Sequence, residues 1–166
     1  MKRNEYESQL LLGAVKKEEG KHPAKRVNIV SLKLVRESTV LYKDRKVRTP
    51  EDAYQLLKPF LAESDRDRLI LLTLDTKSQP TAIHTVSVGT LNSSLVHPRE
   101  VMKVAILSNS ASIIVAHNHP SQDLTESRED VEVTKRLAEA GKVLGIDHLI
   151  IGGKDNYLSM KEKSLF

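Results

Sequence analysis

The chain has 166 residues, of which 39% are hydrophobic and 29% charged, and this balance predicts one soluble globular domain with a single core. It contains no Cys, which excludes a disulfide scaffold, a Cys-ligated zinc site and a thiol nucleophile, and which fits a cytoplasmic protein. The apolar run at residues 10–15 is too short to span a bilayer and follows acidic residues, so we expect neither a signal peptide nor a membrane span.

Positive charge is concentrated in the first part of the chain. Residues 1–50 contain 13 Lys and Arg against 6 Asp and Glu, whereas residues 51–166 contain 13 against 16. We expect residues 1–26 to form a basic arm, either disordered or ordered by a partner, and residues 27–166 to form the domain. The arm is either simply solvated or binds nucleic acid, and binding that strengthens at low salt and is lost on deleting residues 1–26 would support the second reading.

The first predicted elements are a strand and a helix. Residues 27–35 alternate well enough to predict a strand, and residues 43–48 are basic and loop-like. A helix then starts at Thr49-Pro50-Glu51-Asp52, where Thr49 is a good N-cap and Asp52 completes a capping box. Its apolar stripe consists of Ala53, Leu56, Leu57 and Phe60.

The middle of the chain predicts a buried hairpin and a buried helix. Residues 69–74 are apolar apart from one Thr, which is typical of a strand buried on both faces. A turn at 75–80 leads into residues 81–88, which alternate as the partner strand of a hairpin. Residues 98–109 form a helix that is apolar on nearly all sides and should therefore be buried.

The last part of the chain predicts alternating strands and a helix. A short core strand at 112–116 leads directly into His117, and a helix follows at about 126–142. Strands are expected at 146–151 and, as an edge strand, at 157–160. The element order predicts an α/β (α+β) fold, with a mixed central sheet sandwiched by helices.

The candidate functional residues flank the turn at 120–125. His117 and His119 lie two apart at a strand end, so both imidazoles should point to one side, and Ser127 and Asp130 share a face at a helix start. Two imidazoles and one carboxylate are the three-ligand set of a catalytic zinc site, with the fourth position left for water. Zinc lowers the pKa of that water, which suits hydrolysis of an acyl bond.

Each part of this pattern has a purely structural alternative. Ser127-x-x-Asp130 is also the pattern of a helix-capping box, with Thr125 as a competing cap. A His-x-His pair is often an ordinary surface or core feature. Asn118, between the two histidines, should point away from the metal.

The combined spacing resembles a known family. His117-x-His119-Pro120 followed by Ser127-x-x-Asp130 looks like the JAMM motif of MPN/JAB-domain metalloproteases. The longer runs resemble the bacterial RadC-like proteins, once labelled DNA repair proteins, over residues 27–166. These runs are GTLNSSLVHPRE at 89–100, IIVAHNHPS at 113–121 and SRED at 127–130.

The resemblance implies a fold, a cofactor and an activity. The fold is that of the JAB/MPN domain, which is cytidine-deaminase-like. One Zn²⁺ per chain is held by His117, His119 and Asp130, and Ser127 helps to stabilise the oxyanion. The implied reaction is hydrolysis of a peptide or isopeptide bond in a substrate that the sequence does not identify.

The resemblance also implies a general base. In the family this is a Glu that lies eight residues before the Asp of a Leu-Asp-Thr-Lys run. That run is residues 74–77 here, so the matching residue is Asp67, whose side chain is one methylene shorter. Glu63 is the alternative base, and Asp67 is otherwise one charge of the solvated stretch 63–68.

Three further residues are weaker candidates, for substrate binding. Asn92, Ser93 and Ser94 would line the groove beside the metal, although their composition is also that of a plain turn. His84 and His97 are expected to be structural.

Three functions follow from the sequence. The first is a zinc metallopeptidase. The second is a DNA-repair or nucleic-acid-associated protein with a non-catalytic metal-binding MPN domain. The third is a non-catalytic scaffold that has kept its metal.

Overall fold

A computed structural model describes residues 25–89, 96–142, 145–152 and 156–166. The chain divides into two compact units, Met1–Leu32 and Lys33–Phe166. All helices and strands in the described ranges belong to the second unit. The predicted arm at residues 1–26, apart from Lys25 and Arg26, lies outside the described residues.

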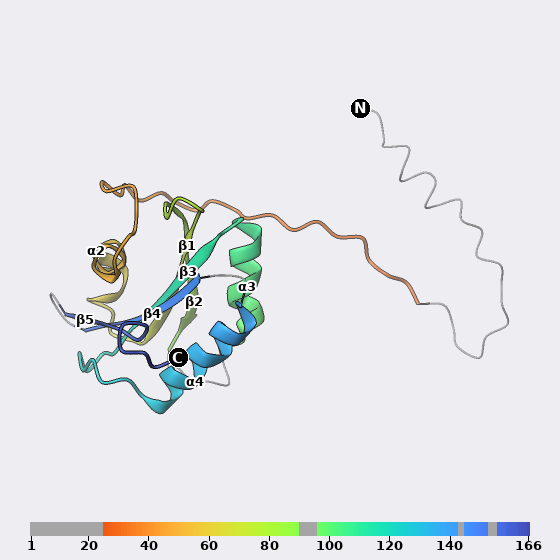
Figure 1. Ribbon diagram of the computed structural model, residues 1–166. Coiled ribbons are helices and arrows are strands. Elements are labelled where there is room, and N and C mark those ends of the chain that lie inside the picture. Colours follow the sequence, from red (N-terminus) through yellow and green to blue (C-terminus); the bar gives the residue numbers. More distant parts are fainter. Residues whose placement is uncertain (1–24, 90–95, 143–144, 153–155) are drawn as a thin grey trace, which may run out of the picture. The chain divides into compact units, whose positions relative to one another are not determined.

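The second unit contains a five-stranded mixed sheet (Figure 1). Its strand order is β2-β1-β3-β4-β5. β3 pairs with β4 in parallel, and the other neighbours pair antiparallel. The strands are β1 (Arg68–Leu74), β2 (Pro80–Val88), β3 (Ser112–Asn118), β4 (Gly145–Ile151) and β5 (Tyr157–Ser159).

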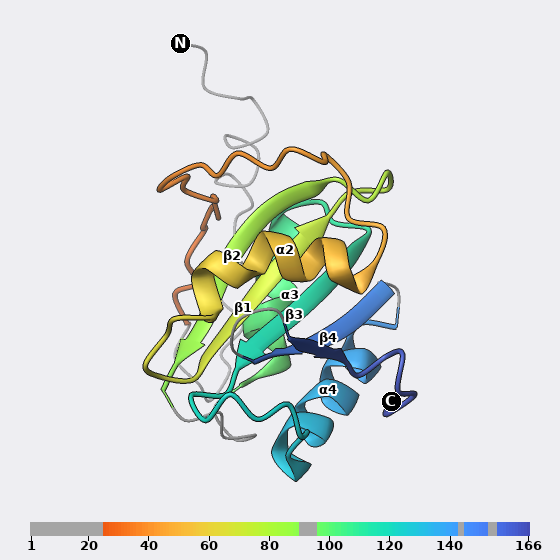
Figure 2. The same cartoon turned by 90° about the vertical axis from the view of Figure 1, so that its left-hand side faces the viewer.

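Helices cover both faces of the sheet. α2 (Pro50–Leu61) packs on one face, and α3 (Pro98–Leu107) and α4 (Arg128–Ala140) pack on the other (Figures 1 and 2). The predicted capping box of α2 is present, because Thr49 Oγ1 accepts from the N–H of Asp52 and the Asp52 carboxylate accepts from the N–H of Thr49. The prediction of a mixed sheet sandwiched by helices is confirmed.

The alternation of strand side chains divides the core into two clusters, one on each face of the sheet. On the α2 side, Leu57 and Leu61 pack against residues such as Ile70 and Leu149. On the α3 and α4 side, Leu137 packs with Leu71, Val115 and their neighbours. β1 is buried on both faces, as its apolar run predicted.

The prediction of a strand at residues 27–35 is wrong. No helix or strand occurs between residues 25 and 41, and Ile29 is 99% exposed. A strand needs a neighbour to satisfy its backbone groups, and its alternation must give one apolar face. Here Ser31 and Lys33 interrupt one face, whereas Val30 and Leu32 place apolar side chains on the other.

The prediction that α3 is buried on nearly all sides is also wrong. Val101, Val104 and Ala105 are buried, but Ile106 is 71% exposed. A helix packed on one face of a sheet hides one stripe, and an apolar residue outside that stripe remains in solvent.

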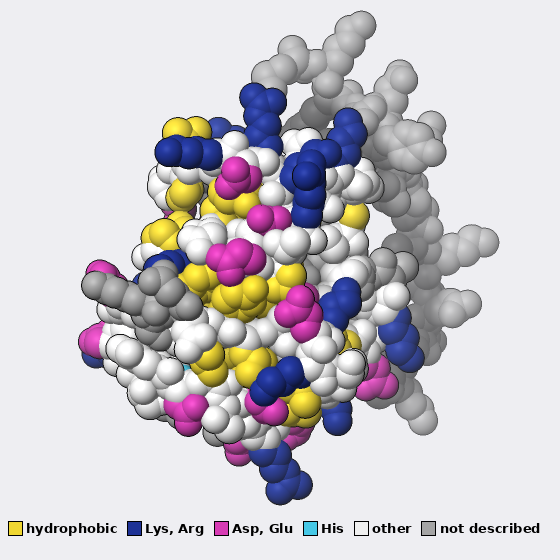
Figure 3. All heavy atoms as spheres, turned by 60° about the vertical axis from the view of Figure 1, so that its left-hand side comes forward, with side chains coloured by type: hydrophobic (Ala, Val, Ile, Leu, Met, Phe, Trp, Pro, Cys, Tyr) yellow, Lys and Arg dark blue, Asp and Glu magenta, His cyan; other side chains and the backbone are white. Residues whose placement is uncertain are grey.

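The surface of the α2 face carries mixed charge. Lys and Arg side chains are interspersed there with Asp and Glu around exposed hydrophobic groups (Figure 3). Among the described residues, no helix is long and apolar enough to cross a membrane.

Candidate metal centre

The sheet places His117 at the buried end of β3. Alternate residues of a strand point to opposite faces. Val115 packs on the α3 and α4 side, so His117 points to that side as well, and its side chain is fully buried. Asn118 points to the other side, as predicted, and its amide contacts backbone groups between Ser64 and Arg68.

The start of α4 supplies the carboxylate. Ser127 is the N-cap, and its Oγ accepts from the N–H of Asp130 at 3.1 Å. Asp130 Oδ2 in turn accepts from the Ser127 N–H at 2.8 Å and from its hydroxyl at 2.6 Å. The capping-box reading is therefore confirmed, and the same box aims Asp130 at the histidines, so the metal-ligand reading stays a prediction. Thr125 is not the cap and instead contacts the Asp123 carboxylate.

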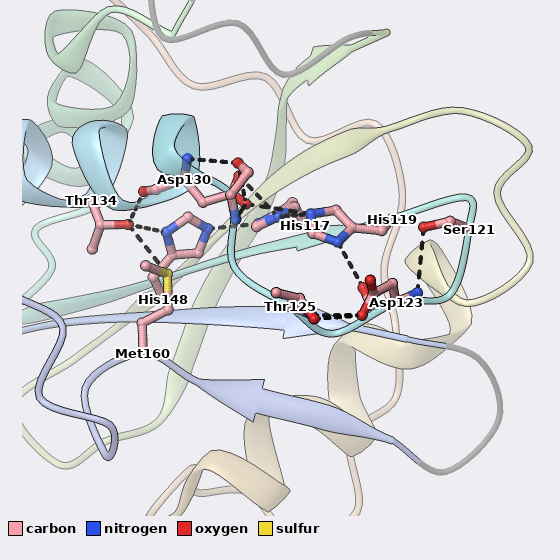
Figure 4. A network of polar contacts seen from close by, with 10 residues as sticks. His117, His119, Ser121, Asp123, Thr125, Asp130, Thr134, His148 and Met160 are labelled. Atoms are coloured by element: carbon pink, nitrogen blue, oxygen red, sulfur yellow. Dashed lines mark hydrogen bonds and ion pairs between the residues drawn. The ribbon is translucent and has the colours of Figure 1, made fainter.

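Three side chains converge on one point (Figure 4). His117 Nε2 lies 2.9 Å from His119 Nε2 and 3.2 Å from Asp130 Oδ1. His119 Nε2 lies 3.4 Å from Asp130 Oδ2. Donor atoms around a tetrahedral ion with bonds of about 2.0–2.1 Å are roughly 3.3–3.4 Å apart. The donor set and its spacing therefore fit a divalent transition metal such as zinc.

A backbone contact fixes which ring nitrogen of His119 carries a hydrogen. Nδ1 lies 2.7 Å from the backbone carbonyl of Asp123, which can only accept, so Nδ1 carries the hydrogen. In the neutral form that a metal would bind, Nε2 would then present its lone pair toward His117 and Asp130. This arrangement is typical of a metal-binding histidine, whose other N–H is held by a backbone carbonyl or carboxylate.

The charges of the site favour an ionised Asp130. Burial raises the pKa of Asp130, but the adjacent imidazoles of His117 and His119 and the hydrogen bond from Ser127 outweigh it and hold the pKa well below its usual range. The same contact raises the pKa of His119, against the effect of burial. The site therefore holds the negative charge of Asp130 beside two imidazoles, and a bound cation would neutralise that charge.

The structure adds two residues that sequence reasoning did not assign to the site. His148 of β4 is fully buried, and its Nε2 lies 2.8 Å from His117 Nδ1. Its Nδ1 contacts the hydroxyl of Thr134, also fully buried, one turn after Asp130 on α4. The available signals were a histidine inside the apolar run at 146–151 and a Thr on the apolar face of α4. Burial lowers the pKa of His148 well below its usual range, which favours the neutral ring.

The two candidate bases lie on the segment between α2 and β1. Asp67 is half-buried, and its negative charge contributes to raising the pKa of His119. Glu63 is exposed and lines a cavity of about 160 Å³ together with Asn118, His119 and Gly152. Asp67 thus acts on His119 through its charge, whereas Glu63 only shares a cavity with it, and the assignment of either as the base stays a prediction.

The remaining predicted residues lie elsewhere. His97 caps α3 by accepting from the N–H of Arg99, a structural role as expected, and His84 is exposed on β2. Asn92, Ser93 and Ser94 lie outside the described residues.

The RadC-like JAB domain family matches residues 47–165 of the sequence. The chain belongs to this family. The sheet with helices on both faces agrees with the JAB/MPN fold that the sequence predicted. The candidate metal site lies within the matched region.

Several curated relatives are similar over most of the chain. A UPF0758 protein of Desulforamulus reducens is 44% identical over 164 residues, covering 95% of this chain and 72% of the relative. UPF0758 proteins of Methanosarcina mazei and Listeria monocytogenes are 49% and 52% identical, and each match covers 72% of this chain. In those two matches the chain spans only about half of the relative, at 53% and 54% of its length. The names of these relatives state no activity.

Proposed function

We propose that this domain is a zinc-dependent hydrolase of peptide or isopeptide bonds. The observation that carries the proposal is the convergence of His117 Nε2, His119 Nε2 and an Asp130 oxygen within 4.8 Å of one another. Three protein ligands leave a fourth position open, which is typical of catalytic rather than structural zinc sites. A bound Zn²⁺ would supply Lewis acidity and an activated water near neutral pH.

The chain's own residues would hold the ion and move one proton. Asp67 is the proposed base that accepts the proton of the attacking water, and its proximity to His119 supports this role. Ser127 has one hydroxyl hydrogen, which it donates to Asp130 Oδ2 at 2.6 Å. The serine therefore orients the carboxylate. To stabilise the oxyanion as well, as proposed, its hydroxyl would have to turn its hydrogen away from Asp130.

Hydrolysis should depend on His119. We expect the zinc-loaded protein to cleave members of a mixed peptide and isopeptide library and the His119→Ala variant to be at least about 100-fold slower, because loss of a ligand exceeds the usual 10–100-fold effect of losing an outer partner. The matched control is His84→Ala, which removes an exposed histidine on β2. Cleavage that survives in His119→Ala, or no cleavage by a zinc-loaded wild type, contradicts the proposal.

The base should be identified by paired substitutions. We expect Asp67→Asn to lower kcat by about 10²–10⁴-fold, the usual contribution of a general base, and Glu63→Gln to leave kcat within about twofold. Zinc affinity, measured alongside, should be unchanged in both. The reverse result assigns the base to Glu63. If cleavage appears only in Asp67→Glu, the natural chain is a non-catalytic metal-binding scaffold.

A further inference from the structure

A continuous chain of polar contacts leads away from the metal centre into the core behind His117 (Figure 4). Its members are His117 on β3, His148 on β4 and Thr134 on α4, and all three side chains are fully buried. β3 and β4 are parallel neighbours, with His148 opposite Val115 and His117 opposite Ile150. The two histidines therefore share the sheet face that α4 covers.

The direction of the hydrogen bonds in this chain is set at Thr134. Thr134 Oγ1 lies 2.6 Å from the backbone carbonyl oxygen of Asp130 and 3.5 Å from the Met160 sulfur. Both neighbours can only accept. The hydrogen of the threonine is therefore used there, and His148 Nδ1, which contacts the same oxygen, must be the donor of their hydrogen bond.

The next two steps follow from the chemistry of a neutral imidazole, which has one N–H and one acceptor nitrogen. Because His148 Nδ1 donates to Thr134, His148 Nε2 accepts. The atom opposite it, His117 Nδ1 at 2.8 Å, then carries the hydrogen. His117 Nε2 is left with its lone pair, and this is the atom directed at His119 and Asp130.

We propose that Thr134 and His148 are positioning residues that hold His117 in the tautomer whose Nε2 lone pair faces the metal centre. The opposite direction would leave the 2.6 Å contact between the Thr134 hydroxyl and the Asp130 carbonyl without a hydrogen, and would place an N–H where a ligand needs a lone pair. The metal-binding consequence rests on the proposed zinc site, whereas the tautomer does not.

Thr134 also connects two of the proposed ligands, Asp130 and His117. Thr134 contacts the backbone of Asp130 and the ring of His148, and His148 contacts His117. The position of α4 and the orientation of His117 are therefore coupled through buried side chains. His119 does not need this device, because the Asp123 carbonyl already holds its Nδ1.

The test compares Thr134→Val, which keeps the side-chain shape and removes the hydroxyl, with Thr134→Ser, which keeps the hydroxyl. His148→Leu and His148→Gln form a second pair, because a Gln amide can again accept from His117. Two quantities are measured at pH 8. They are the affinity for Zn²⁺ alone, by competition with a chromophoric chelator, and the tautomer of His117 in the metal-free protein, by ¹⁵N chemical shifts of the ring.

We expect His117 to be protonated on Nδ1 in the wild type and in Thr134→Ser, and to become a mixture of tautomers in Thr134→Val. Zinc affinity should fall about 10–100-fold in Thr134→Val and in His148→Leu, the usual effect of removing an outer partner of a ligand. It should stay within about threefold of the wild type in Thr134→Ser and recover in part in His148→Gln. If His148→Leu does not fold, the Thr134 pair decides alone.

The inference is overturned if metal-free wild-type His117 is protonated on Nε2, or if Thr134→Val keeps both the tautomer and the affinity. Lower affinity with an unchanged tautomer would also overturn it, because it would show only a packing defect. If the wild type binds no Zn²⁺, the proposed function fails, and the ¹⁵N shifts still decide whether Thr134 and His148 set the tautomer.

Discussion

Replacing Asp130 with Ala is expected to reduce zinc affinity by at least about 100-fold, more than the loss of any outer partner of the site. Asp130 is the only acidic member of the candidate ligand group among the described residues, and its two oxygens face His117 and His119 at 3.2 and 3.4 Å. Without it, a divalent cation would be held by two neutral imidazoles alone. The measurement is competition with a chromophoric chelator at pH 8, above the usual pKa of a histidine.

The substitution also removes the carboxylate that accepts from the Ser127 N–H in the capping box of α4, which typically costs on the order of 1 kcal/mol of folding stability. Circular dichroism and urea unfolding must therefore show that the variant remains folded. The matched control is Glu129→Ala, which removes an exposed carboxylate from the same turn and should bind zinc as the wild type does. Equal zinc affinity in Asp130→Ala and the wild type would show that the site has been misassigned.

The elements that could be predicted from sequence are those whose local chemistry and tertiary contacts agree. Thr49 and Pro50 favour a helix start whatever lies nearby, and α2 begins there. The apolar run at 69–74 must be buried, and it is buried as β1 between β2 and β3. The convergence of His117, His119 and Asp130 could be predicted because strand period puts the two histidines on one face and helix period puts Ser127 and Asp130 on one face.

The elements that could not be predicted depend on neighbours that are distant in sequence. Whether residues 27–35 form a strand depends on a partner strand, and their sequence does not specify one. His148 reads as part of an apolar strand, and only the parallel pairing of β4 with β3 brings it against His117. The outer partner of a ligand is set by sheet topology, which one-dimensional periodicity does not contain.

The capping box shows why local and functional interpretations of one motif are not exclusive. A residue three positions after an N-cap must turn its carboxylate back toward the helix start in order to accept from the N-cap N–H. In this fold the end of β3 lies at that place, so the same rotamer brings Asp130 to His117. The capping box thus also holds Asp130 in the candidate metal site, and Ser127 is the N-cap that does so.

Replacing Leu71 with Ala is expected to lower the free energy of unfolding by about 2–5 kcal/mol, because the side chain is wholly buried and its removal leaves a cavity. Leu71 lies in the middle of β1 and packs in the cluster that includes Val115 and Leu137. The matched control is Ile106→Ala on α3, where the side chain is 71% exposed and the change should stay within about 0.5 kcal/mol. Urea unfolding with equal slopes for all three proteins provides the comparison.

This core cluster and the metal centre both lie along the pair of strands β1 and β3. Repeating the unfolding measurement with zinc is therefore informative. Leu71 pairs with Val115, two residues before His117 on β3, so the cavity would form beside the strand that holds the first ligand. A ligand that binds only the folded state adds about 4 kcal/mol at a concentration 1,000 times its Kd. Zinc should therefore offset most of the loss in Leu71→Ala, but it should stabilise Asp130→Ala far less than the wild type. Equal stabilisation of both variants would mean that zinc binds somewhere other than at His117, His119 and Asp130.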